Sequence, residues 1–105
     1  MVYTIDELSR LIIPIAKKYE ITTVFLFGSY ACGNATDDSD VDIMFKREGS
    51  KIQGFVMGAL YEDLRKSIGK EIDLLTEESL EQHSAKEKTP WFYKNLLRER
   101  VKILG

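Results

Sequence analysis

The 105-residue sequence contains few of the residues that mark several common protein classes. Its single cysteine, Cys32, rules out an intrachain disulfide and any zinc site built from a cysteine cluster. No apolar run approaches the length needed to span a bilayer, and the first residues do not form a secretory signal peptide. We therefore expect a soluble, cytoplasmic domain that does not act on membranes.

The sequence also has no strong excess of charge of either sign. The chain has fifteen Lys and Arg residues and seventeen Asp and Glu residues, which gives a net charge of −2. This balance argues against direct binding of nucleic acid, because such proteins normally carry a basic face. The charge balance does not exclude a nucleotide as ligand, since a metal ion can neutralise the phosphates. The length and the ordinary globular composition predict one domain over residues 1–105.

The spacing of apolar residues predicts alternating helices and strands. Thr4 and Glu7 have the spacing of a capping box that starts the first helix, and Pro14 is expected to kink that helix without ending it. A short helical turn is expected around Tyr30. The predicted helices cover 4–19, 52–68 and 89–100, and the predicted strands cover 21–27, 40–46, 70–75 and 101–104.

This order predicts an α/β (α+β) fold in which helices pack against a small mixed β-sheet. Gly28-Ser29 ends the first predicted strand, and Asp40-Val41-Asp42 opens the second. If both belong to one site, the first two strands must run antiparallel.

The Asp40-Val41-Asp42 sequence is the first candidate for chemistry. Side chains one residue apart on a strand point to the same face, so Asp40 and Asp42 would lie close together. Like charges at that distance repel unless a cation lies between them. We therefore predict a divalent-metal site beside the Gly28-Ser29 turn. Asp37 and Asp38, in contrast, are interpreted as part of a solvated acidic loop.

Asp73 is the third acidic candidate, because it interrupts the apolar strand predicted at 70–75. A carboxylate there is unfavourable unless it has a partner. If the third strand lies beside the second, Asp73 faces the same way as Asp40 and Asp42. Three carboxylates beside a phosphate-binding turn suit two Mg²⁺ ions, which prefer oxygen ligands. A salt-bridged or edge-strand carboxylate is the alternative.

Together these motifs resemble the polymerase-beta nucleotidyltransferase superfamily. The evidence is Gly28-Ser29, ten intervening residues, the Asp40/Asp42 pair and an acidic residue on a later strand. The small size is similar to the minimal nucleotidyltransferases, which are antitoxins paired with HEPN-type ribonuclease toxins. The resemblance implies a nucleotidyltransferase fold, two Mg²⁺ ions as cofactors and ATP as the substrate.

The resemblance also implies a role for each site residue. Asp40 and Asp42 would bind both metals, while Asp73 would hold the catalytic metal and help remove the proton of the acceptor. Gly28 and Ser29 would bind the triphosphate. AMP would be transferred to a tyrosine hydroxyl of a cognate HEPN-type toxin and would silence it.

One position departs from the family pattern. The family often has an arginine just before the glycine that follows the Gly-Ser segment, where this chain has Cys32 before Gly33. The missing cation would weaken phosphate binding or change nucleotide preference. A second interpretation, motivated by the acidic balance and the aromatic cluster at 91–93, is a binding module that neutralises its partner by complex formation, with weak catalysis or none. Nucleotide transfer to a small molecule is a third interpretation, and it ranks last because 105 residues leave little room for the second domain that usually forms the acceptor pocket.

The consecutive aromatic residues Trp91, Phe92 and Tyr93 cannot all face one core if they lie on a helix. They indicate either a surface for a partner, in a homo- or hetero-oligomer, or shared burial beneath the polar segment 76–88.

Overall fold

The computed structural model describes residues 2–79 and 98–105. Seven helices and strands with defined bounds lie within these residues. They are α1 (Ile5–Lys18), β1 (Val24–Phe27), α2 (Gly28–Cys32), β2 (Val41–Phe45), α3 (Val56–Ile68), β3 (Ile72–Thr76) and β4 (Val101–Leu104). The predicted order of elements is thus confirmed over the described part of the chain.

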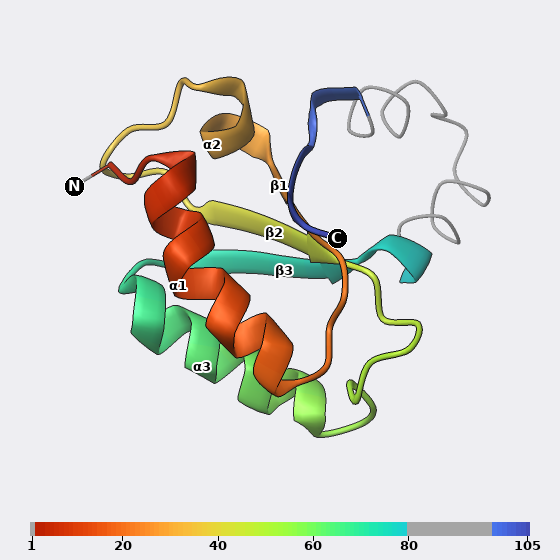
Figure 1. The fold of residues 1–105 in the computed structure, drawn as a ribbon. Coiled ribbons are helices and arrows are strands. Elements are labelled where there is room, and N and C mark those ends of the chain that lie inside the picture. Colours follow the sequence, from red (N-terminus) through yellow and green to blue (C-terminus); the bar gives the residue numbers. More distant parts are fainter. Residues whose placement is uncertain (1, 80–97) are drawn as a thin grey trace.

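The strands form one mixed four-stranded sheet in the order β3-β2-β1-β4 (Figure 1). β1 pairs antiparallel with β2 and with β4, and β2 pairs parallel with β3. This confirms both the predicted antiparallel first pair and the predicted short edge strand at the C-terminal end.

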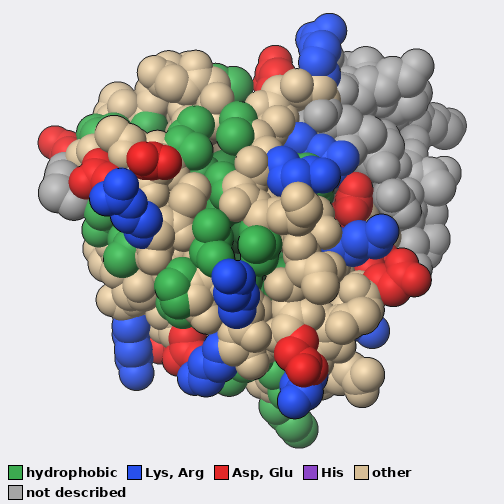
Figure 2. All heavy atoms as spheres, in the orientation of Figure 1, with side chains coloured by type: hydrophobic (Ala, Val, Ile, Leu, Met, Phe, Trp, Pro, Cys, Tyr) green, Lys and Arg blue, Asp and Glu red, His purple; other side chains and the backbone are tan. Residues whose placement is uncertain are grey.

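Helices α1 and α3 pack against each other and cover one face of this sheet (Figure 1). Strand alternation turns Val41, Ile43 and Phe45 of β2 into the core beneath them. The helices contribute buried residues at three- and four-residue spacing, namely Leu8, Ile12 and Ala16 of α1 and Leu60, Leu64 and Ile68 of α3. On the solvent side, cationic and anionic side chains are interspersed (Figure 2). The remaining face of the sheet carries the residues of the candidate site.

The predicted capping box is present at the start of α1. The Thr4 hydroxyl accepts a hydrogen bond from the Glu7 backbone N–H, and the Glu7 carboxylate accepts one from the Thr4 N–H. The helix continues through Pro14, as expected.

The start of α3 differs from the prediction. The helix begins at Val56, and the preceding segment is irregular, with Gly54 at a positive φ of 55°. Ile52 is still buried in the core, but it belongs to this irregular segment. Its apolar character therefore reflects burial and not helix formation. Phe55, an apolar residue within the predicted helix at 52–68, is 100% exposed.

The bounds of three strands also differ from the prediction, and β3 begins at Ile72 instead of at residue 70. β1 begins at Val24, although Ile21 is buried just before it. β2 begins at Val41, so Asp40 lies in the segment leading into the strand.

Two predictions fall outside the described residues. The helix at 89–100 does so for most of its length, and so do the side chains of Trp91, Phe92 and Tyr93. Among the helices that the structure does describe, none has the length and apolar character required to cross a bilayer.

Two tyrosine hydroxyls in the core region have contrasting environments. The Tyr3 hydroxyl donates a hydrogen bond of 2.6 Å to the Ile68 carbonyl at the end of α3. The Tyr30 side chain, on α2, is only 4% exposed, and its hydroxyl has no hydrogen-bond partner within residues 2–79 and 98–105. A buried hydroxyl without a partner keeps its desolvation penalty.

These environments predict opposite effects of removing the two hydroxyls. Tyr30→Phe should raise the free energy of unfolding by about 1 kcal/mol, whereas Tyr3→Phe should lower it by about 1 kcal/mol. Urea denaturation of both variants and the wild type measures the difference. A loss of stability in Tyr30→Phe would show that this hydroxyl is satisfied in solution.

Candidate active site

Asp42 and Asp73 lie side by side on adjacent strands. They are direct partners in the parallel register of β2 and β3, and on its other side Asp42 is opposite Phe27, the last residue of β1. Because Ile72 and Leu74 pack against the helix-covered core, strand alternation turns Asp73 to the opposite face, as predicted. Val41 and Ile43 also pack in this core, so Asp42 between them points to the same face as Asp73.

The three predicted carboxylates interact electrostatically. Burial first, and then the negative charges of Asp73 and Asp40, raise the pKa of the Asp42 carboxyl to about 6. Asp42 is partly buried, while Asp40 and Asp73 are exposed. The structure thus brings all three into one neighbourhood, with Asp42 at its centre.

Gly28 lies close to the Asp42 carboxylate of this acidic group. It has a φ of +70°, a conformation that glycine adopts without strain, and it joins β1 to α2. A Cβ atom at this position would overlap Asp42 Oδ2 and lie 3.0 Å from Asp42 Cγ. Any side chain at position 28 would therefore displace the carboxylate, which explains why the turn next to Asp42 is built with glycine.

The rest of α2 extends this turn. Ser29 is half-buried, and its carbonyl accepts hydrogen bonds from the N–H groups of Gly33 and Asn34, which close the short helix. Cys32 is exposed, and its sulfur lies 3.8 Å from Glu99 Oε2. A carboxylate therefore stands near the position where the family often has an arginine.

The acidic group suits a divalent cation by its chemistry. Its oxygen donors are those that Mg²⁺ prefers, and a cation would offset the negative charges of Asp73 and Asp40, which add to burial in raising the pKa of Asp42. The coordination sphere is not preassembled, because no three His, Cys, Asp or Glu side chains among residues 2–79 and 98–105 are placed to hold a metal together. The residues fit the ion in the chemical type of their donor atoms.

Two features near the site were not predicted from the sequence. Lys70 Nζ donates a 2.8 Å hydrogen bond to the Asp37 carbonyl, which ties the segment before Asp40 to the start of β3. Arg100 stacks on the Phe25 ring, with Cζ 3.8 Å from the centroid, and forms a 2.9 Å ion pair with the Glu77 carboxylate. Both contacts join residues more than twenty positions apart, so local sequence patterns do not reveal them.

Comparison with known proteins gives matches over most of the chain. Residues 10–90 match the family model described as "Polymerase beta, Nucleotidyltransferase". Two relatives from Methanocaldococcus jannaschii are named "Putative protein adenylyltransferase", MJ0435 and MJ1379. The first is 34% identical over 95% of this chain and 98% of its own length, and the second is 39% identical over 60% and 64%.

Solved structures share the fold. One is described as the crystal structure of a toxin–antitoxin with AMP-PNP, and another as a mutant of the toxin–antitoxin MntA-HpeT. Both have a TM-score of 0.68 and cover 92% of this chain and 73% of theirs, at 19% and 16% identity. The fold, the family model and the full-length relative agree with the motifs: the chain belongs to the polymerase beta nucleotidyltransferase family.

Proposed function

We propose that the 105 residues act as a single Mg²⁺-dependent nucleotidyltransferase domain that transfers AMP from ATP to a tyrosine hydroxyl of a cognate HEPN-type toxin. The main support is the acidic group around Asp42, placed in direct contact with the Gly28 turn. The names of the relatives support protein adenylylation, and the descriptions of the structural neighbours support a toxin as partner.

In this proposal, the Gly28-Ser29 turn binds the triphosphate and the three carboxylates bind the metal ions. Gly28 lets the triphosphate approach the backbone, and Ser29 binds its terminal phosphates through its hydroxyl and N–H. Asp40, Asp42 and Asp73 supply the carboxylate oxygens for two Mg²⁺ ions. When bound, these ions neutralise charge on the phosphates and make the acceptor hydroxyl more acidic.

The reaction is an in-line displacement at the α-phosphorus of ATP. The acceptor oxygen forms a bond to that phosphorus while Asp73 helps to remove its proton. The bond to the bridging oxygen breaks, and pyrophosphate leaves with the electron pair. Since positioning and charge neutralisation supply most of the catalysis in phosphoryl transfer, the chain needs no nucleophile of its own.

Replacing Asp42 by asparagine tests this proposal. Asp42→Asn removes the central charge at almost the same size, so transfer of label from α-labelled ATP to the co-purified partner should fall to the no-enzyme level. Asp38→Asn is the matched control, because it removes an exposed charge from the same acidic segment and should leave transfer unchanged. Equal labelling by Asp42→Asn and the wild type would exclude catalysis at this site. Loss of transfer in Asp42→Asn with neutralisation of the toxin retained would instead support neutralisation by binding alone.

The contact between Gly28 and Asp42 predicts the effect of adding one methyl group. Gly28→Ala should lower the transfer rate by about 100-fold or more, because the methyl group displaces the Asp42 carboxylate by about 1 Å. Gly33→Ala is a close control. Gly33 has a similar φ of +78°, but nothing lies within 4 Å of an added Cβ, so this variant carries the backbone strain without the clash. Equal losses in both variants would attribute the effect to backbone strain.

The raised pKa of Asp42 predicts a pH dependence of stability in metal-free protein. Between the ordinary value of 3.8 and about 6, the folded state holds a proton that the unfolded chain has released, so stability falls as pH rises through this window. Asp42→Asn lacks this term and should exceed the wild type by about 1 kcal/mol at pH 7, after allowance for partial exposure. The difference should disappear near pH 4. Thermal denaturation at both pH values measures it, and a difference independent of pH would contradict the assigned cause.

A further inference from the structure

The order of the strands sets the side from which an acceptor reaches the site. Gly28 lies at the end of β1, Asp42 on the neighbouring β2 and Asp73 on β3, which is an edge strand of the sheet. In an in-line displacement the attacking and leaving oxygens lie on opposite sides of the phosphorus. If pyrophosphate is held at Gly28, as the proposed function requires, the acceptor enters past β3.

A basic hollow lies where α3 ends and the chain leads into β3. It has a volume of about 400 Å³ and is lined by Arg65, Lys66, Gly69, Lys70 and Glu71. Glu71 precedes Asp73 by two residues on the same stretch of chain, which corresponds to about 7 Å in an extended strand. The hollow is therefore joined to Asp73 by a short length of chain, and α3 itself packs against the opposite face of the sheet.

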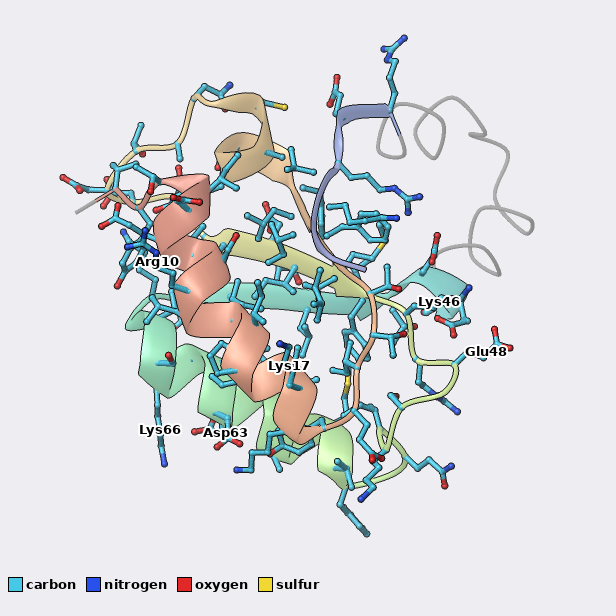
Figure 3. All side chains as sticks on the ribbon, in the orientation of Figure 1. Arg10, Lys17, Lys46, Glu48, Asp63 and Lys66 are labelled. Atoms are coloured by element: carbon cyan, nitrogen blue, oxygen red, sulfur yellow. The ribbon has the colours of Figure 1, made fainter. Side chains whose placement is uncertain are left out.

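The charges in the hollow are unevenly neutralised. Arg65 forms a 3.0 Å ion pair with Glu71, and Lys70 is engaged by the Asp37 carbonyl. Lys66 makes no hydrogen bond or ion pair with any other residue of 2–79 and 98–105. Its acidic neighbour Asp63 is already bound by Tyr19 and Lys18. Lys66 extends away from the end of α3 in Figure 3.

We propose that this hollow docks an acidic segment of the acceptor protein and so places an adjacent tyrosine at Asp73. The lining holds three cations and one carboxylate on a chain whose total charge is −2, and the carboxylates of Asp37 and Asp63 interact with Lys70 and Lys66 from outside the lining. An extended peptide advances about 3.3 Å per residue. Acidic residues two to four positions from the tyrosine would therefore reach Arg65 and Lys66 while the hydroxyl lies near Asp73.

The hollow is less suited to nucleic acid. A polynucleotide requires a row of cations along the backbone and aromatic side chains for stacking, whereas this hollow is compact, lacks an aromatic residue and includes Glu71. An acidic peptide needs only a local positive charge.

Two peptides and two charge reversals test the docking site. One fluorescent peptide carries tyrosine flanked by glutamates, and the other carries tyrosine flanked by glutamines. Lys66→Glu reverses the charge in the hollow, and Lys17→Glu is the matched control, since each lysine is exposed in the last turn of its helix. Figure 3 shows Lys17 on α1, away from Lys66. Anisotropy is measured with Mg²⁺ and AMP-PNP, and transfer is measured with Mg²⁺ and ATP.

Wild-type protein should prefer the glutamate peptide, and Lys66→Glu should weaken its binding about tenfold, with a matching rise in KM and no change in kcat. Lys17→Glu should leave binding, KM and kcat unchanged. Equal effects of the two reversals, equal binding of the two peptides, or stronger competition by a single-stranded oligonucleotide than by unlabelled glutamate peptide would overturn the docking site.

The two readouts separate this inference from the proposed function on which it rests. Charge-selective binding that depends on Lys66, without AMP transfer to either peptide or to the co-purified partner, would support docking and contradict the enzymatic proposal. AMP transfer without preference for the glutamate peptide would support the enzyme and contradict docking.

Discussion

The carboxylate of Asp42 is held in a partly buried position, where burial first and then the negative charges of Asp73 and Asp40 raise its pKa to about 6. The parallel register of β2 and β3 fixes Asp42 beside Asp73, and the contact with Gly28 limits where the Asp42 carboxylate can lie. The strands tolerate this arrangement because α1 and α3 bury their other face in a continuous apolar core. The apolar packing on one face of the sheet thus stabilises a fold in which neighbouring carboxylates lie on the other face.

The parts of this arrangement that could be predicted are those encoded by local patterns. Apolar residues alternate with Asp42 and with Asp73, so the face of each carboxylate follows from the two-residue period of a strand. The capping box of α1 needs only Thr4 and Glu7, which lie three residues apart. The antiparallel pairing of β1 and β2 followed from requiring Gly28 and Asp42 to meet. Each inference used residues close in sequence or one functional requirement.

The parts that could not be predicted depend on contacts between distant residues. Ile52 continues the apolar period of α3 but enters the core from irregular chain, because burial and helix formation leave the same mark on a sequence. Phe55 fits that period and is nevertheless exposed. The Lys70 contact with the Asp37 carbonyl and the Arg100–Glu77 pair arise only when the sheet is assembled. The steric role of Gly28 likewise requires the position of Asp42.

The most direct test of the central claim is the location of a divalent cation in solution. Mn²⁺ prefers the same oxygen ligands as Mg²⁺ and broadens nearby amide signals in the nuclear magnetic resonance spectrum. The account predicts that Mn²⁺ first broadens the amides of Asp40, Asp42 and Asp73 together with Gly28, and that Asp42→Asn abolishes this effect. Broadening confined to Asp37 and Asp38, or unchanged broadening in Asp42→Asn, would contradict it.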